Sequence, residues 1–263
     1  MPFLRNGDME GFFSELREII KDLQREIPSL DFNDFVVKYK RDSQEAVNTA
    51  ITAKAEEKAK DWICPRLPEW VSPDILTVLG YVGMIITGLG FIFGFVNKWF
   101  ILLIPFGLFV NWFGDSFDGS IARYRKKTRP NYGYFIDKIV DAVAVITLAL
   151  GIGLSGFVKI EIALLFACAY LALMIFVDLV VYVEGKAKNS FGLLGPTEIR
   201  IIGALFSIYM FFSKVRYIDI WGHSLTQYDL GIFALTAVMF GILAVSIIKK
   251  GIELHKIDIA KWK

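Results

Sequence analysis

Long apolar stretches separated by short polar breaks constrain this chain more than any other feature. Six of them lie between Pro73 and Ile248. Each approaches the roughly 20 mostly apolar residues that a helix needs to cross a bilayer core about 30 Å thick. With 55% hydrophobic residues, 21% charged residues and a mean hydropathy of +0.50, the chain is too apolar for an ordinary soluble domain. We therefore expect an all-α, polytopic membrane protein.

Residues 67–263 are predicted to form a domain of six transmembrane helices. The predicted spans lie near 73–96, 99–123, 132–156, 159–184, 193–212 and 228–248. Lys and Arg residues are concentrated after the second, fourth and sixth spans, with five of them between Arg123 and Arg129. Because basic loops stay in the cytoplasm, we expect an integral membrane protein with both termini and the active site on the cytoplasmic side.

Residues 1–66 form a separate N-terminal helical segment in this prediction. Apolar residues recur at helical spacing over 9–27 opposite a charged face, and a second, polar helix is expected over 43–62. The segment is either a small cytoplasmic cap or a helix lying in the headgroup region with Trp62 and Trp70 as interfacial anchors. Since no secretory signal peptide is evident, membrane insertion is expected to depend on the internal spans.

Four aspartates in the second and third predicted spans are the strongest functional signal. An ionisable side chain inside a span costs roughly 2.5 to 3.5 kcal/mol on insertion scales, so something must offset that cost. Asp115 and Asp118 lie three residues apart on one helical face, and Asp137 and Asp141 lie four apart on another. Because a short loop joins the two spans, we expect the helices to pack antiparallel and the four carboxylates to converge.

A bound divalent cation would neutralise such a cluster. Carboxylates in a small volume repel one another, and ligation by oxygen alone is typical of Mg²⁺, Mn²⁺ or Ca²⁺. Gly119, Ala122 and Gly133 lack bulky side chains on the same segments, and Arg123 adds a cation suited to a phosphate. The alternative is a network of salt bridges between the aspartates and neighbouring Arg and Lys side chains.

The order of these residues resembles the signature of the CDP-alcohol phosphotransferase (CDP-alcohol phosphatidyltransferase) family. The pattern D-x2-D-G-x2-A-R begins at Asp115, nine residues follow, and G-x3-D-x3-D begins at Gly133. The spacer is one residue longer than is common in the family, and the additional residue falls in a loop around Pro130. Residues 71–77 also look like the family's usual opening, with Asp74 in place of the commoner Asn.

This resemblance implies a transfer reaction in phospholipid biosynthesis. A substituted phosphate passes from a CDP-linked donor, such as CDP-diacylglycerol, CDP-archaeol or a CDP-alcohol, to an acceptor hydroxyl, and CMP is released. One of the two substrates is a lipid. The family resemblance also implies Mg²⁺, with Mn²⁺ as a possible substitute, and a homodimer.

The resemblance assigns roles to residues of the signature. The expected metal ligands are Asp115, Asp118, Asp137 and Asp141, and Asp141 is also the expected general base. The expected contacts to the CDP moiety are Asp115, Gly119, Ala122, Arg123 and Gly133.

Polar residues outside the signature give weaker predictions. Arg200, at the start of the fifth span, either binds a phosphate or carboxylate of the acceptor or, with Glu198, simply belongs to a polar helix start. Asp178, deep in the fourth span, either faces a polar cavity or pairs with a neighbouring helix. Cys64 and Cys168 are expected to be packing residues. His223 and His255 fall outside the spans and are expected at the surface.

Two other functions compete with the transferase. One is a cation transporter with intramembrane carboxylates, but transport sites usually lie near the bilayer midplane, whereas these aspartates lie near one face. The other is an inactive lipid-binding relative, which the intact set of aspartates argues against. The net charge of +2 gives no reason to expect a nucleic-acid partner.

Overall fold

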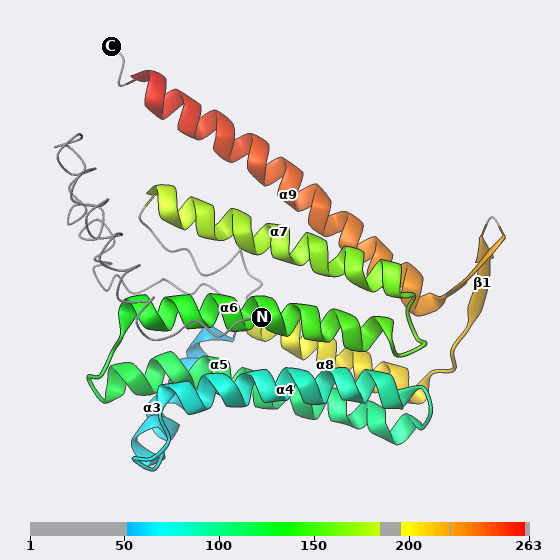
Figure 1. Ribbon diagram of the computed structural model, residues 1–263, viewed down its shortest axis with the longest axis horizontal. Helices are drawn as coiled ribbons and strands as arrows, with labels where there is room; N and C mark the ends of the chain where they lie inside the picture. Colours follow the sequence, from blue (N-terminus) through cyan, green and yellow to red (C-terminus); the bar gives the residue numbers. More distant parts are fainter. Residues whose placement is uncertain (1–51, 185–195, 221, 261–263) are drawn as a thin grey trace, which may run out of the picture. The chain divides into compact units, whose positions relative to one another are not determined.

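Helices make up almost all of the chain that the structure describes (Figure 1). The structure is a computed structural model, and it describes residues 52–184, 196–220 and 222–260, all within the unit Ala46–Lys263. The main helices are α3 (Ala53–Ile63), α4 (Pro73–Gly94), α5 (Leu103–Tyr124), α6 (Pro130–Gly153), α7 (Ile160–Glu184), α8 (Pro196–Phe212) and α9 (Gln227–Ala260). The short elements are the 3₁₀ helices η1 (Cys64–Arg66) and η2 (Lys98–Leu102) and the strands β1 (Tyr217–Ile220) and β2 (His223–Thr226).

Four of the predicted spans have the length and apolar composition to cross a bilayer. They are Pro73–Gly94, Lys98–Tyr124, Ile160–Val183 and Gln227–Ile259. Helix α6 is long enough to cross a bilayer but carries too many charges. Every 18-residue stretch of it contains Asp137, Lys138 and Asp141. Helix α8 has only 17 residues. Within the described residues, the structure therefore supports four of the six spans.

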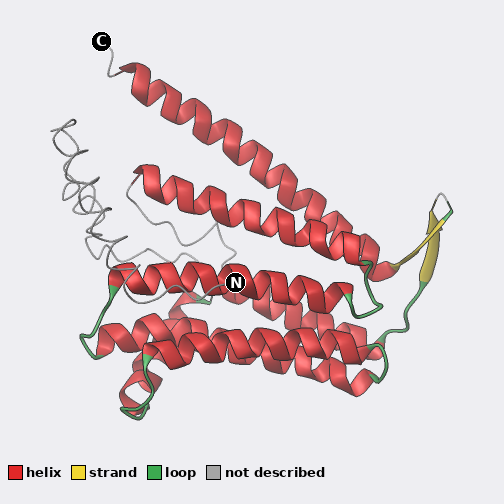
Figure 2. Cartoon of the chain, in the orientation of Figure 1, coloured by secondary structure: helices red, strands yellow, loops and turns green. Residues whose placement is uncertain are grey.

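The structure differs from the sequence prediction at the C-terminal end of the domain. The last helix, α9, continues to Ala260 rather than ending near residue 248, in keeping with the absence of proline from this stretch. The two strands, yellow in Figure 2, are an exception to the all-α prediction. They form an antiparallel hairpin in which Ile220 pairs with His223, and Gly222 has the positive φ of +79° that a tight turn requires.

Parts of the N-terminal prediction can be compared with the structure. Helix α3 overlaps the second half of the predicted polar helix over 43–62, while the predicted helix over 9–27 lies outside the described residues. Cys64 is buried, as expected of a packing residue, whereas Cys168 is exposed, so that its predicted role in packing is wrong. His223 and His255 are exposed, as predicted.

Glycines allow α4 and α5 to pack closely along their length. A Cβ atom added to Gly114 would come within 3.0 Å of backbone atoms of Gly80 and Leu76, and one added to Gly83 would meet the backbone of Gly107 and Asn111 just as closely. Small residues of this kind let membrane helices approach backbone to backbone. The contact fixes the half of α5 that carries the first two aspartates.

Helix α6 packs against a different face of α4, where Gly151 lies against the backbone of Gly88. The sequence predicted that α5 and α6 would pack directly side by side. Among the described residues, both helices instead make their main contacts with α4, and the cavity described below is lined by all three helices.

Local signals fix where these helices begin and end. Ser72 caps α4 by accepting a hydrogen bond from the backbone N–H of Ile75 at 3.2 Å, and Pro73 follows at the first helical position. Helix α5 ends where Lys126 adopts the left-handed conformation, with a φ of +55°, and Pro130 begins α6. The connection between the two helices is therefore short, and it brings the end of α5 near the start of α6.

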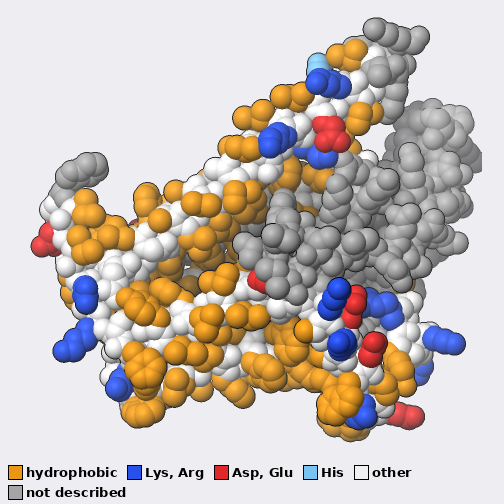
Figure 3. Space-filling view, turned by 180° about the vertical axis from the view of Figure 1, so that it is seen from behind, with side chains coloured by type: hydrophobic (Ala, Val, Ile, Leu, Met, Phe, Trp, Pro, Cys, Tyr) orange, Lys and Arg blue, Asp and Glu red, His pale blue; other side chains and the backbone are white. Residues whose placement is uncertain are grey.

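Apolar side chains also cover much of the outer surface (Figure 3). On the face shown, they spread over the helices, while most charged side chains gather toward the helix ends. Such a surface is unfavourable in water and suited to the hydrocarbon region of a bilayer.

Candidate active site

The four predicted aspartates line one cavity between three helices. The lining residues are Thr77, Gly80 and Tyr81 from α4, Asn111, Asp115 and Asp118 from α5, and Asp137, Val140, Asp141 and Ala144 from α6. The expected convergence of the two pairs is therefore observed, although α5 and α6 meet around a cavity rather than in direct contact. The cavity lies near the α5–α6 connection, since Asp118 is six residues before Tyr124 at the end of α5 and Asp137 is seven after Pro130 at the start of α6.

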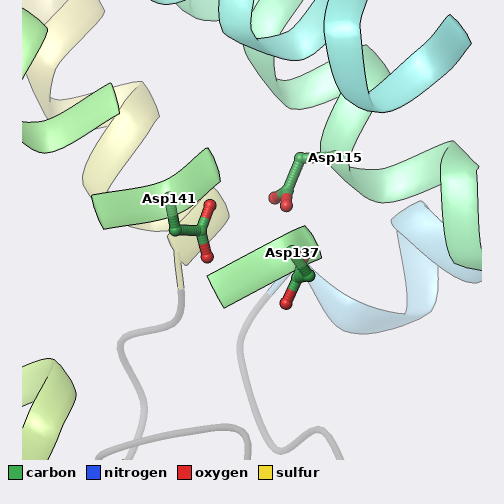
Figure 4. A group of neighbouring side chains, drawn as sticks. All are labelled: Asp115, Asp137 and Asp141. Carbon is green, nitrogen blue, oxygen red and sulfur yellow. The ribbon is translucent and has the colours of Figure 1, made fainter. Parts of the chain in front are cut away.

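Asp115, Asp137 and Asp141 form the tightest group in the cavity (Figure 4). One carboxylate oxygen of each lies within 4.8 Å of the corresponding oxygen of the other two, and all three residues are half-buried. An oxygen-only donor set with several negative charges fits a hard divalent cation such as Mg²⁺ or Mn²⁺. The observed arrangement is thus suited to the metal predicted from the sequence.

Asp118 lines the same cavity, but hydrogen bonds hold its carboxylate. The hydroxyl of Thr77 donates to Oδ2 of Asp118 at 2.7 Å, and the backbone N–H of Gly119 donates to Oδ1. Thr77 comes from α4, so this contact ties the orientation of Asp118 to the closely packed α4–α5 pair.

Two cations contact the acidic cluster. The Arg200 guanidinium donates from Nη2 to Oδ2 of Asp115 at 2.7 Å and from Nε to Oδ1 of Asn111 at 2.7 Å. The Lys138 ammonium lies 3.8 Å from Oδ2 of Asp137 and 3.9 Å from Oδ1 of Asp178. Because four carboxylates face two cations in contact with them, the described ion pairs leave negative charge for a further cation to neutralise.

The described contacts also bear on the alternatives left open by the sequence. Arg123 donates to the hydroxyl of Ser120 at 3.2 Å, and no described ion pair joins it to the aspartates. Asp178 pairs with a neighbouring helix, since the Tyr134 hydroxyl of α6 donates to it at 3.0 Å. Arg200 does more than begin a helix, because both of its partners line the cavity.

The residues predicted to bind the CDP moiety lie on the same helices, close to the connection between them. Gly119 and Ala122 are half-buried on the last two turns of α5, and Arg123 is exposed beside them. Gly133 is exposed on the first turn of α6, where a Cβ atom added to it would meet no other atom within 4 Å. Apart from Asp115, these residues do not belong to the cavity lining, and their contacts to a nucleotide stay a prediction.

Sequence reasoning missed three polar residues of the cavity. Asn111 donates from Nδ2 to the Gly80 carbonyl at 3.0 Å while its Oδ1 accepts from Arg200. Thr77 holds Asp118, and the Tyr81 hydroxyl lies 3.2 Å from Oγ1 of Thr147. For Asn111, the sequence did offer a signal, namely an amide side chain within an apolar span. Burying an amide without partners is costly, so such a residue indicates a packed or functional position.

Comparisons with known proteins point in the same direction as this geometry. Residues 70–247 match the family described as CDP-alcohol phosphatidyltransferase. Cholinephosphotransferase 1 of Danio rerio is 27% identical over 60% of this chain and 42% of its own length. Cholinephosphotransferase 1 of Gallus gallus is 26% identical over 68% of this chain and 55% of its own length. The chain thus spans about half the length of these relatives.

Proposed function

Since the chain belongs to the CDP-alcohol phosphatidyltransferase family, we propose that it transfers a substituted phosphate group from a CDP-linked donor to an alcohol and releases CMP. The observation that carries this proposal is the group formed by Asp115, Asp137 and Asp141, in which one carboxylate oxygen of each lies within 4.8 Å of those of the other two. All three belong to the family signature and lie in the matched region. Phospholipid headgroup transfer is the general activity of such enzymes.

Asp115, Asp118, Asp137 and Asp141 are the proposed ligands of Mg²⁺ or Mn²⁺. The metal would neutralise the charge that develops on the leaving phosphate and hold the diphosphate in position. The donor set supports this assignment because it offers oxygen atoms alone and carries more negative charge than its two contacting cations balance.

Asp141 is the proposed general base. The acceptor hydroxyl attacks the donor phosphorus remote from cytidine, the bond from that phosphorus to the CMP oxygen breaks, and the hydroxyl proton passes to the Asp141 carboxylate. The position of Asp141 in the cavity wall, close to Asp115 and Asp137, supports this role because the base must lie beside the reacting phosphate.

The substrates are expected to lie on two sides of the acidic cluster. The CDP moiety is assigned to Asp115, Gly119, Ala122, Arg123 and Gly133, toward the α5–α6 connection. Arg200 is the candidate contact for an anionic group of the acceptor, because its partners Asn111 and Asp115 both line the cavity. Phosphocholine is one transferred group to test, given the names of the relatives.

We further propose that all six helices from α4 to α9 cross the membrane, with both termini and the acidic cluster on the cytoplasmic side. The basic residues between Arg123 and Arg129 support this orientation, because they adjoin the end of the domain that holds the aspartates. The homodimer implied by the family resemblance stays a prediction.

A direct assay tests the proposed reaction. Purified protein is incubated with radiolabelled CDP-diacylglycerol, CDP-archaeol or CDP-choline and a panel of alcohol acceptors, and CMP release is measured with Mg²⁺ and with a chelator. We expect Mg²⁺-dependent CMP release that also requires an acceptor. Absence of CMP release with every donor, together with cation flux in proteoliposomes, would favour the transporter instead.

A further inference from the structure

Helix α3 contacts α8, the helix that carries Arg200, from outside the region matched by the family. That region begins at residue 70, whereas α3 ends at Ile63. The Glu56 side chain of α3 is only 11% exposed, and its Oε2 accepts a hydrogen bond from the Thr197 hydroxyl of α8 at 2.9 Å. The Ser116 side chain of α5 also helps to lower the pKa of Glu56. The Glu56 carboxylate therefore holds the first turn of α8.

A second contact fixes the same turn of α8. Glu198 is buried, and its Oε1 accepts from the backbone N–H of Thr52 at 2.9 Å and from the Thr52 hydroxyl at 2.7 Å. Thr197 and Glu198 are the second and third residues of α8. The start of α8 is thus held at two adjacent positions by residues that precede the family region.

These contacts lie next to the ion pair at the edge of the acidic cluster. Ser116 follows Asp115 directly in α5. In α8, Thr197 lies three residues before Arg200, so these two side chains lie on one face of the helix. Arg200 and Asp115 are joined at 2.7 Å, with side chains that are 17% and 28% exposed. Glu56 therefore holds the turn of α8 that precedes the cation of this pair.

The charge of Glu56 strengthens its contacts. Burial disfavours the charged carboxylate, but the Lys60 ammonium at 2.5 Å and the Thr197 hydroxyl outweigh that effect and hold the pKa of Glu56 below its ordinary value. An ionised acceptor forms shorter and stronger hydrogen bonds than a neutral one. The contact is consequently present across the neutral pH range.

We propose that Thr52 and Glu56 are positioning residues, which hold the first turn of α8 so that Arg200 meets Asp115 and Asn111. This inference rests on the proposed function, because it assigns α3 a part in the same site. One consequence can be measured. Arg200 and a divalent cation compete for the Asp115 carboxylate, so loosening the first turn of α8 weakens the guanidinium contact and strengthens cation binding.

The test uses substitutions that change no charge in α3 or the first turn of α8. The double variant Thr52→Val/Thr197→Val removes both hydroxyl contacts, and Arg200→Gln removes the competing cation. Thr128→Val, in the exposed loop between α5 and α6, is the matched control. Mn²⁺ is titrated into each purified protein, and free Mn²⁺ is measured by electron paramagnetic resonance. A triple variant that combines Thr52→Val, Thr197→Val and Arg200→Gln completes a double-mutant cycle.

We expect the double variant to bind Mn²⁺ roughly threefold to tenfold more tightly than the wild type, and Thr128→Val to match the wild type. In the Arg200→Gln background, the two threonine substitutions should cause no further increase in Mn²⁺ affinity. Unchanged Mn²⁺ affinity with only a lower unfolding temperature, or an equal effect in both backgrounds, would overturn the proposal by making α3 a purely stabilising element.

Two further outcomes are also informative. If the double variant does not fold, Thr197→Val alone is used with the same criteria. If the wild type binds no Mn²⁺, the proposed metal site fails, and the unfolding temperatures of the same cycle decide the positioning role. Coupling between the threonine substitutions and Arg200→Gln supports it, and strict additivity overturns it.

Discussion

The pair α4 and α5 differs from the pair α7 and α9 in how much of each helix is buried. In the most apolar stretch of α4, 44% of the residues are buried, against 11% in each of α7 and α9. Glycines in the first pair meet neighbouring backbone, as at Gly83 and Gly114, whereas nothing lies within 4 Å of a Cβ placed at Gly231 or Gly241 of α9. Within the described residues, α4 and α5, the inner pair, pack closely against other helices. Helices α7 and α9, the outer pair, expose more of their apolar side chains.

This difference bears on where the acidic cluster lies. Carboxylates that are proposed to share one cation need a backbone whose spacing is fixed, and close packing of α4 against α5 and α6 supplies it. Asn111, a buried polar residue of α5, has its partners on α4 and α8. Outer side chains such as Ile175 and Val238 are 60% and 58% exposed, and apolar identity is all that their surroundings require.

The largest expected effect separates a cavity aspartate from a surface aspartate. Asp141→Asn removes the proposed base and a ligand, so we expect CMP release to fall by about 10³-fold while the protein still folds. Asp219→Asn, in the exposed strand β1, should leave turnover unchanged. Equal turnover in both variants would show that the cavity carboxylates are not the catalytic ones.

The next effect compares a packed glycine with an open one. Gly114→Ala places a methyl group against the backbone of Gly80 and Leu76, so we expect the free energy of unfolding to fall by about 1–3 kcal/mol, with lower activity because Asp115 is adjacent. Gly241→Ala should change stability by no more than about 0.5 kcal/mol. The free energy of unfolding of both variants is measured in a mild detergent. Similar losses of stability in the two variants would contradict the difference in packing between the two helix pairs.

A smaller effect tests the contact that orients Asp118. Thr77→Val keeps the shape of the side chain and removes the hydrogen bond to Oδ2, so we expect roughly a tenfold decrease in kcat/KM. The unfolding temperature should change little. Wild-type kinetics in this variant would mean that α4 does not control the orientation of Asp118.

The smallest effect is expected on the outer helix. Val238→Ala trims a side chain that is 58% exposed, and we expect a change in unfolding free energy of no more than about 0.5 kcal/mol. A loss well above 1 kcal/mol, measured in the same detergent, would show that another element or a second copy of the chain covers this face of α9.

Hydropathy predicted much of this fold because spans such as α4 and α7 are long and apolar. It placed a span at 228–248, which lies within α9, but not the continuation of the helix to Ala260, since a helix can continue beyond the bilayer without any change that hydropathy detects. It missed the hairpin from Tyr217 to Thr226 because each strand has only four residues. Direct packing of α5 on α6 was also wrong, since short loops indicate neighbours along the chain and not which helix intervenes.

The candidate site was more predictable than its supporting contacts. Asp115, Asp118, Asp137 and Asp141 could be found because a charge in an apolar span needs an explanation. The contact of Arg200 with Asp115 spans 85 positions, and that of Thr197 with Glu56 spans 141, so no local pattern encodes either. Such contacts depend on how α3 and α8 meet α5 in three dimensions.

Binding of Mn²⁺ to the purified protein, followed by electron paramagnetic resonance, tests the central claim most directly. The claim is that the carboxylates of α5 and α6 together hold a divalent cation. The account predicts that the wild type binds Mn²⁺, that Mg²⁺ displaces it, and that Asp137→Asn weakens binding at least about tenfold. No binding by the wild type, or equal binding by Asp137→Asn, would contradict it.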